Sequence, residues 1–273
     1  MTDRYAIVGN PVGFSKSPLI HTEFARQTGQ DIEYTRLEAP LGRFKETVDA
    51  FRAAGAKGVN VTAPFKLDAF AYATEVSEAA RLAGAANALS FDGERVRAEN
   101  FDGVGLVNDI QRNLGFKLQG KRVLLLGAGG AARGALLPLL AQQPAEFVLA
   151  NRTAAKAQEL ARQCQSAGPI RGCGLRNLEG LAFDIVLNAT SASLAGELPA
   201  VPADVFGSAQ LAYELAYAKG LTPFLRLAQG AGVQRLADGV GMLVEQAAEA
   251  FQWWRGVRPD TAGLIRQLTV PLV

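Results

Sequence analysis

The sequence predicts an α/β protein of two domains, each built on a largely parallel sheet with helices on its faces. Strand-like and helix-like patterns alternate along most of the chain, which is the order expected of such sheets. A glycine-rich turn between an apolar strand and an apolar helix starts a second run of this alternation. The 273 residues, 49% of them hydrophobic and 20% charged, suffice for two globular cores.

The first hundred residues predict three strands, each followed by a helix. Alternation with period 2 marks the strands, and apolar spacing of three and four marks the helices. The predicted strands are 4–9, 32–39 and 57–63, and the predicted helices are 19–27, 44–55 and 75–84. Residues 84–102 follow as two short strands around an Asp92-Gly93 turn.

The second run begins near Gly103 with a predicted helix over 103–115. The segments that follow are a strand, glycine turn and helix over 121–141, strands at 146–152, 183–190 and 210–217, and a helix at 222–232. Helices at 239–256 and 261–268 close the chain. We therefore expect a domain of residues 1–102 and 239–273, to which the C-terminal helices return, and a second domain of residues 103–238.

Composition excludes several classes of protein. A formal charge of +2 gives no reason to expect a nucleic acid or an anionic membrane as partner, so a small molecule fits better. Cys164 and Cys173 match neither a CxxC motif nor a zinc site, and no secretory signal or membrane-spanning run is found. His21 is the only histidine, so we expect no metal site and no catalytic triad, and a packed or capping role for His21. A cytoplasmic monomer or homodimer is expected.

A dinucleotide site is predicted at the turn after the apolar strand RVLLL. Glycines between a strand and a helix permit a tight turn and bring backbone N–H groups close to a pyrophosphate at the helix N-terminus. The predicted contacts are Gly127, Ala128, Gly129, Gly130 and Ala131.

The end of the next predicted strand indicates NADP as the cofactor. An NAD site usually has an acid there for the ribose 2′-hydroxyl, whereas this chain has neutral Asn151, then Arg152 and Thr153, with Lys156 one helical turn on. Two cations suit a 2′-phosphate, because each can form charge-assisted hydrogen bonds with it.

The N-terminal domain offers the groups that would handle the substrate. Lys66 lies just beyond the strand GVNVT, in a predicted loop, and Asp102 lies at the domain joint, so the two could form an acid/base pair. Neutral donors and acceptors at strand ends and in loops surround them and fit a small polyhydroxylated molecule: Ser15, Ser17, Asn60, Thr62 and Asn87.

A series of motifs over nearly the whole chain resembles the shikimate dehydrogenase family. In order they are GNPVGFSKSPLIH, GVNVTAPFK, GAANAL, ENFDGVG, LLLGAGGAARG, NRT, NATS and DGVGMLVEQAAEAF. The resemblance implies a two-domain α/β enzyme that reduces 3-dehydroshikimate to shikimate with NADPH. It also implies a place in aromatic amino-acid biosynthesis.

The resemblance also implies residue roles. Lys66 and Asp102 match the catalytic pair, and Ser15 and Ser17 match the hydroxyls that hold the substrate carboxylate. Residues around the ring hydroxyls are matched by Asn60, Thr62, Asn87, Tyr217 and Gln246. Beyond the glycine turn and the segment 151–156, the cofactor positions include Thr190, Leu215 and Gly239.

Some positions depart from the family's usual pattern. Phe14 stands where the family usually has histidine, Phe101 stands where it has threonine, and Ala86 and Ala88 flank Asn87. Strand alternation could point Phe101 away from Asp102. A paralogue that prefers quinate or aminoshikimate, or a weakly active NADP-binding homologue, therefore stays open.

Overall fold

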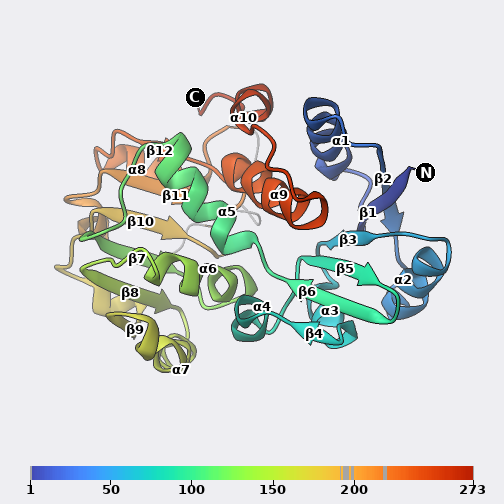
Figure 1. The fold of residues 1–273 in the computed structure, drawn as a ribbon. Helices are drawn as coiled ribbons and strands as arrows, with labels where there is room; N and C mark the ends of the chain where they lie inside the picture. The colour runs from blue at the N-terminus through green and yellow to red at the C-terminus, as the bar shows by residue number, and fades with distance from the viewer. Residues whose placement is uncertain (1, 191, 193–196, 198–199, 218–219, 273) are drawn as a thin grey trace. The chain divides into compact units, whose positions relative to one another are not determined.

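The computed structural model describes residues 2–190, 192, 197, 200–217 and 220–272, which form two compact units (Figure 1). Unit 1 comprises Met1–Gly105 and Val244–Leu264, and unit 2 comprises Leu106–Leu243 and Ile265–Val273. The bounds predicted from the sequence were 1–102 with 239–273, and 103–238. In the structure residues 103–105 group with unit 1, and residues 239–243 and Ile265–Val273 group with unit 2. Leu272 packs against the apolar core of that unit.

Unit 1 is built on a six-stranded mixed sheet. Its strands lie in the order β2-β1-β3-β5-β6-β4, with β3–β5 and β5–β6 antiparallel and the other pairs parallel. The strands are β1 (Asp3–Gly9), β2 (Ile32–Glu38), β3 (Gly58–Val61), β4 (Glu75–Val76), β5 (Ala88–Asp92) and β6 (Arg95–Glu99). The helices that precede the unit boundary are α1 (Ser17–Thr28), α2 (Phe44–Ala53), α3 (Lys66–Tyr72) and α4 (Glu78–Ala83).

Local sequence explains where these elements start and stop. Helix α1 has a proline in its first turn and ends at Gly29, whose φ of 65° is the left-handed conformation that glycine adopts readily. The Ser77 side chain caps α4 by accepting a hydrogen bond from the Ala80 N–H at 3.1 Å. Strands β5 and β6 form the hairpin predicted around Asp92-Gly93.

Unit 2 contains a six-stranded, wholly parallel sheet in the order β12-β11-β10-β7-β8-β9. Read from β9, this order is that of the doubly wound dinucleotide-binding fold. The strands are β7 (Arg122–Leu126), β8 (Glu146–Asn151), β9 (Ile170–Gly174), β10 (Ile185–Asn188), β11 (Leu211–Glu214) and β12 (Leu236–Ala237), and the helices are α6 (Gly130–Leu140), α7 (Ala154–Cys164) and α8 (Pro223–Gly230).

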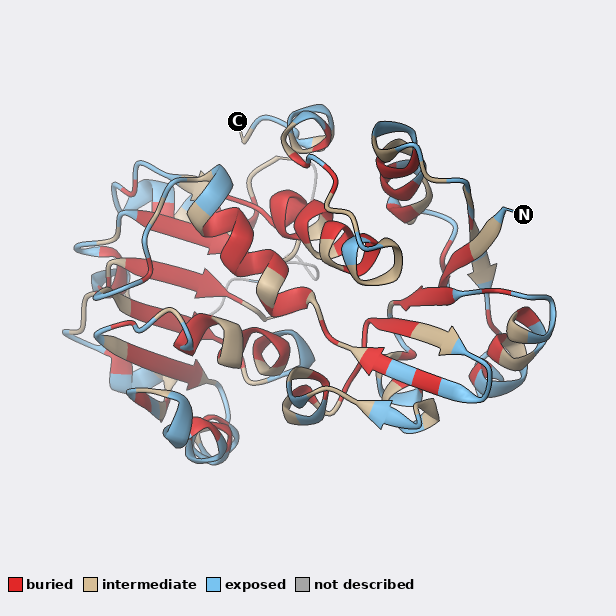
Figure 2. Cartoon of the chain, viewed as in Figure 1, coloured by how far each residue is buried: buried red, intermediate tan, exposed pale blue. Residues whose placement is uncertain are grey.

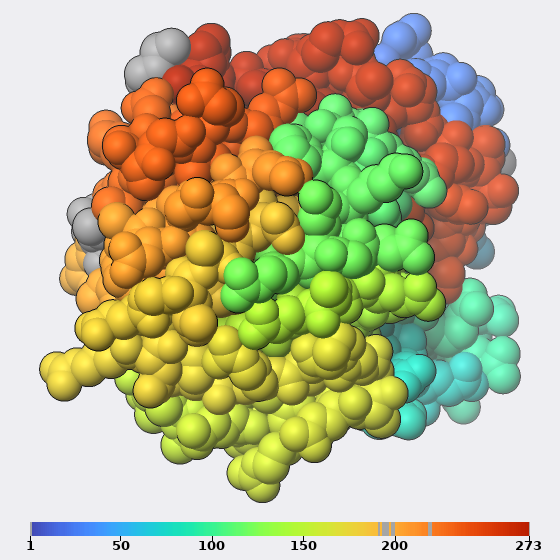
Figure 3. Space-filling view, turned by 90° about the vertical axis from the view of Figure 1, so that its left-hand side faces the viewer, coloured from blue at the N-terminus to red at the C-terminus, as the bar shows by residue number. Residues whose placement is uncertain are grey.

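Burial follows this topology. The central strands of unit 2 are buried along their length, as expected when helices cover a parallel sheet, and those helices expose their outer faces (Figure 2). Figure 3 shows the unit in space-filling form, its chain running from green through yellow to orange. The parallel α/β prediction is confirmed for this unit, and unit 1 is α/β with a mixed sheet.

Three helices have residues in both units: α5 (Asp102–Asn108), α9 (Val240–Arg255) and α10 (Ala262–Leu268). The predicted helix over 103–115 continues from α5 as a π-helical turn at Asp109–Asn113, where the Asn113 amide donates to Asp109 Oδ1 at 2.9 Å. No helix in the part of the chain that the structure describes is long and apolar enough to span a membrane.

Two local predictions were wrong. Lys66 does not lie in a loop, because it is the first residue of α3. Residues 75–84 do not form one helix, because Glu75–Val76 pair with β6 before Ser77 starts α4. The seven-residue α3 and the two-residue β4 are too short to leave a clear periodic pattern.

Candidate active site

The predicted acid/base pair is in direct contact within unit 1. Lys66 Nζ lies 2.6 Å from Asp102 Oδ2. Each residue begins a helix, Lys66 starting α3 and Asp102 starting α5. The Lys66 side chain is 35% exposed and that of Asp102 only 12%, so Lys66 is the more accessible member of the pair.

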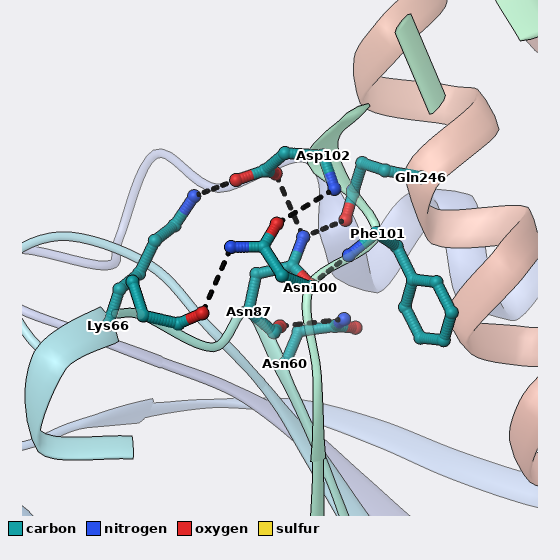
Figure 4. Close-up of polar contacts among 8 residues, drawn as sticks. Asn60, Lys66, Asn87, Asn100, Phe101, Asp102 and Gln246 are labelled. Carbon is teal, nitrogen blue, oxygen red and sulfur yellow. Dashed lines mark hydrogen bonds and ion pairs between the residues drawn. The ribbon is translucent and has the colours of Figure 1, made fainter. Parts of the chain in front are cut away.

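Asn87 ties this pair to helix α9. Its amide nitrogen donates to Asp102 Oδ1 at 2.8 Å and to Gln246 Oε1 at 3.1 Å, and its oxygen accepts from the Phe101 N–H at 2.9 Å (Figure 4). Asn87 is itself buried. The four residues Lys66, Asp102, Asn87 and Gln246 therefore form one hydrogen-bonded chain, although 159 positions separate Asn87 from Gln246.

Asn100 and Phe101 fix the backbone in front of the carboxylate. The Asp102 N–H donates to Asn100 Oδ1 at 3.2 Å, and the Asn100 amide donates to the Ala85 carbonyl at 3.1 Å. Figure 4 shows the Phe101 ring turned away from the Lys66–Asp102 contact. The ring packs edge-on against Trp253, with centroids 5.7 Å apart, so this departure from the family pattern leaves the pair uncovered.

Asn60 lies on β3 beside this chain. Its amide nitrogen donates to the Asn87 carbonyl at 3.3 Å, and its oxygen accepts from the Tyr34 hydroxyl at 2.7 Å. Thr62 follows the same strand and is half-buried, and its methyl group would be 2.6 Å from a Cβ placed on Gly9. A glycine at position 9 is what lets the first strand pass so close to Thr62.

Ser15 and Ser17 lie side by side at the start of α1. The Ser15 hydroxyl is 3.2 Å from both the Ser17 hydroxyl and the Ser17 N–H. The Arg36 guanidinium donates to the Ser15 carbonyl at 2.7 Å, which anchors the loop to β2. Phe14 just before them is 91% exposed, so it fills no part of the core.

This arrangement can move a proton at an accessible ammonium group. The buried side of Asp102 is satisfied by Asn87, which leaves Lys66 as the group that a ligand oxygen can approach. The neutral amides and hydroxyls around it can bind a ligand that carries several oxygens. In the described part of the chain, no group of three or more His, Cys, Asp or Glu residues is placed to hold a metal ion.

The glycine turn in unit 2 fits a dinucleotide pyrophosphate. Gly127 has φ of 103°, a conformation that side chains disfavour, and a Cβ there would lie 3.1 Å from the Ala189 backbone. Gly129 and Gly130 have open space around them, and α6 has no acidic residue in its first turn. The free N–H groups of this helix N-terminus can therefore meet an anion.

The residues predicted to select NADP lie where β8 ends and α7 begins. Asn151 is half-buried and donates from its amide to the Thr153 carbonyl at 3.0 Å, while Arg152, Thr153 and Lys156 are exposed. The Lys156 N–H donates to the Thr153 carbonyl at 3.1 Å, in the first turn of α7. The two cations thus lie within one turn of chain at the carboxyl end of β8, the edge at which this fold binds nucleotides.

Three further predicted cofactor residues follow β10, β11 and β12. The Thr190 N–H and hydroxyl donate to Asn188 Oδ1 at 3.1 Å and 2.8 Å. Leu215 and Gly239 touch through their backbones, because a Cβ on Gly239 would lie 2.0 Å from the Leu215 carbonyl oxygen. Tyr217, predicted to bind substrate, belongs to unit 2 and is 44% exposed.

We expect Gly239→Ala to destabilise unit 2 by about 1 to 3 kcal/mol, because the added methyl group would force two backbone segments apart. Thermal unfolding of the variant and the wild type measures this change. Gly263→Ala, where a Cβ would meet nothing within 4 Å, is the control. Equal melting temperatures for Gly239→Ala and the wild type would contradict the close approach.

Sequence reasoning missed Tyr34 and gave Asn100 no role. Tyr34 is buried on β2, where the alternation of IEYTRLE already favoured an inward-facing position. A buried tyrosine hydroxyl needs a hydrogen-bond partner, and that requirement was the signal available in the sequence. Asn100 precedes α5, a position where asparagine side chains often bind the first N–H groups of a helix.

Three family models match the chain. They are the shikimate dehydrogenase substrate binding domain over residues 7–89, shikimate / quinate 5-dehydrogenase over 109–195, and the shikimate 5′-dehydrogenase C-terminal domain over 239–269. Together they cover most of the sequence.

Individual proteins and solved structures are similar to this chain over nearly its whole length. A shikimate dehydrogenase (NADP(+)) of Chromobacterium violaceum is 54% identical over 98% of each chain. Among solved structures, an Ael1 enzyme from Pseudomonas putida is 60% identical with a TM-score of 0.96 over 100% of both chains. Shikimate 5-dehydrogenase from Thermus thermophilus, in complex with NADP(H) and shikimate, is 30% identical with a TM-score of 0.85 over 97% of this chain and 98% of that one. With its two α/β units, its Lys66–Asp102 pair and these matches, the chain belongs to the shikimate dehydrogenase family.

Proposed function

We propose that the protein is an NADP-dependent shikimate dehydrogenase, which interconverts 3-dehydroshikimate and shikimate. The observation that carries the proposal is the contact of Lys66 with Asp102 and its support by Asn87. Relatives that are 54% identical are named shikimate dehydrogenase (NADP(+)), which supports reading this contact as the acid/base pair of that reaction.

Lys66 and Asp102 would handle the proton of the substrate oxygen, and the residues around them would bind the substrate. NADPH bound at the glycine turn would supply the hydride that reduces the substrate carbonyl, and the carbonyl oxygen needs a proton. Lys66 Nζ donates that proton during reduction and accepts it during oxidation, while Asp102 holds the ammonium group in place. Ser15 and Ser17 bind the substrate carboxylate, and Asn60, Thr62, Asn87, Gln246 and Tyr217 bind its hydroxyl groups.

Each group of predicted cofactor residues binds a different part of NADP. The turn Gly127 to Ala131 binds the pyrophosphate, Asn151 to Thr153 and Lys156 bind the adenosine end with its 2′-phosphate, and Thr190, Leu215 and Gly239 bind the nicotinamide half. The open backbone of the turn and the exposed cations beyond β8 support this assignment.

Preference for a related ring acid is the second candidate, and Phe14 is the observation that favours it. This residue replaces the family's usual histidine, immediately before Ser15, and its side chain is 91% exposed. An aromatic side chain free to reach a ligand at this loop can change which acid binds best. Phe101 supports no such change, because its ring packs against Trp253.

The test is the initial rate of NADPH formation with shikimate and with quinate, each supplied with NADP and with NAD. Fast turnover with shikimate and NADP alone supports the proposal. Turnover of quinate in preference to shikimate supports the second candidate. Cofactor binding without turnover of either acid would contradict both and favour a weakly active homologue.

The basis of cofactor choice can be tested separately. We expect the double substitution Arg152→Ala with Lys156→Ala to raise KM for NADP by about tenfold to a hundredfold, because two charge-assisted contacts to the 2′-phosphate are lost. KM for NAD should change little. Arg162→Ala, on the exposed side of the same helix, is the control. An equal effect on both cofactors would refute the assignment.

We also propose that the enzyme is cytoplasmic. Cys164 and Cys173 are both buried as free thiols, which suits the reducing conditions of a cytoplasm. We also propose that it acts as a monomer or homodimer, which sedimentation of the purified protein would decide.

A further inference from the structure

We propose that Tyr34 is a positioning residue for the substrate site: its hydroxyl fixes the Asn60 amide so that the nitrogen, and not the oxygen, is turned to a substrate hydroxyl. The inference rests on the proposed function, because it names what orients one of the proposed substrate contacts. Nothing in the sequence motifs includes Tyr34.

The hydrogen bonds around Asn60 define the orientation of the amide. The Tyr34 hydroxyl donates to Asn60 Oδ1 at 2.7 Å, and Asn60 Nδ2 donates to the Asn87 carbonyl at 3.3 Å. The two ends of an amide have nearly the same size, so packing alone does not choose between them. The Asn87 carbonyl can only accept, so it favours the same orientation through a long contact, while the much shorter contact from Tyr34 holds the oxygen. The second hydrogen on Nδ2 is the group that we assign to the substrate.

The Tyr34 ring is itself held rigidly. The ring is buried and stacks on His21, with centroids 4.2 Å apart and planes within 4°. His21 in turn packs against Trp254 at 5.6 Å and edge-on against Phe24 at 5.9 Å. A ring fixed in this way delivers its hydroxyl to one place, which is what orientation of the amide requires.

The hydroxyl stays protonated under working conditions. Burial raises the pKa of Tyr34 well above its ordinary value of 10.0, and a side-chain hydrogen bond from Ser17 offsets only part of that rise. A tyrosine that keeps its proton can go on donating the hydrogen bond to Asn60 Oδ1 that the structure shows. The same phenol also links Asn60 to Ser17, another proposed substrate contact.

Tyr34→Phe removes this hydroxyl and leaves the aromatic stack in place. We expect KM for shikimate to rise about threefold to tenfold, the effect of losing one ordinary hydrogen bond, with kcat changed less than about threefold. An amide that binds the substrate hydroxyl equally in the ground state and the transition state contributes to KM and not to kcat. KM for NADP should be unchanged.

Tyr5→Phe is the matched control. Tyr5 pairs with Tyr34 in the register of β1 and β2, is equally buried, and also loses one hydroxyl in the variant. That hydroxyl accepts from Arg255 at 3.4 Å and does not reach Asn60. A general loosening of the sheet would raise KM in both variants, whereas the proposed role affects Tyr34→Phe alone.

Two measurements show whether Tyr34 acts through Asn60. In a double-mutant cycle, Tyr34→Phe should raise KM much less in Asn60→Ala than in the wild type, and any remaining rise reflects the lost Ser17 contact. The NMR signals of the Asn60 side-chain amide, identified by their loss in Asn60→Ala, should shift in Tyr34→Phe and not in Tyr5→Phe. Additive effects in the cycle, or unshifted amide signals, would overturn the proposal.

The amide signals do not depend on the substrate, so the two proposals can fail separately. If the wild type turns over no shikimate, the proposed function is wrong, and the NMR comparison alone decides whether Tyr34 orients Asn60. If the wild type is active and the amide signals shift while KM stays constant, the orientation of Asn60 has no effect on binding and this inference is wrong.

Discussion

Lys66→Ala should lower kcat for shikimate oxidation by about two to four orders of magnitude, the usual contribution of a general acid or base. Its ammonium group lies 2.6 Å from Asp102 and is the accessible member of the pair. Loss of the side chain removes the proton carrier and leaves the Asn87 contact to Asp102 intact. Single-turnover and steady-state rates with saturating NADP measure the effect.

The control for this substitution is Lys57→Ala, since Lys57 is an exposed lysine of the same unit. NADP affinity should be little changed in either variant, because the proposed cofactor residues belong to unit 2. A loss of kcat below about tenfold in Lys66→Ala would return Lys66 to the role of an ordinary surface ion pair.

Mild acid should destabilise unit 1 because the buried His21 ring stays neutral in the folded protein. Burial lowers the pKa of His21 from 6.5 to about 3, so the folded protein leaves the ring neutral where the unfolded chain binds a proton. The folded pKa is the lower one. The His21 contribution to stability is therefore complete above pH 6.5 and is lost as the pH falls towards 3.

The expected loss between pH 6.5 and about 5.5 is about 1 kcal/mol, since the slope approaches about 1.4 kcal/mol per unit of pH below 6.5 and carboxylates titrate mainly below this window. His21 is the only histidine in the sequence, so no other imidazole titrates in this pH range. Both tryptophans, Trp253 and Trp254, lie in unit 1, so denaturant unfolding followed by tryptophan fluorescence reports on the relevant unit.

His21→Phe is the control, because phenylalanine can stack on Tyr34 and cannot take up a proton. Its unfolding free energy should be nearly constant from pH 6.5 to about 5.5. A wild-type protein as insensitive to pH as this variant would show that His21 is not the group that carries the effect.

Unit 2 could be predicted in detail because the sequence patterns that indicate its strands, its glycine turn and its helices are local. A buried parallel strand reads as a continuous apolar run, and RVLLL is one. The glycines, the helix that they open and the cations after β8 all lie within about 30 residues of one another in the sequence. Neighbouring strands of this fold then bring Thr190, Leu215 and Gly239 to the same edge of the sheet.

The substrate side was predicted less completely. The donors and the acid/base pair could be named from motifs, but the helix that Lys66 begins is too short to predict from periodicity. Phe101 looked like a change in the pocket, and its direction depends on the packing partner Trp253, which is 152 residues away. The helical position of Lys66 and the direction of the Phe101 ring therefore became clear only in the folded structure.

By itself the sequence determined the class of fold and the family, and it predicted the dinucleotide turn and the catalytic residues, because each is encoded in short runs of neighbouring residues. The tertiary structure alone decided that Asn87 joins Asp102 to Gln246 and that Tyr34 holds Asn60. A hydrogen bond needs a distance near 3 Å and a suitable angle, and residues far apart in sequence meet that condition only once the sheet and helix α9 have packed.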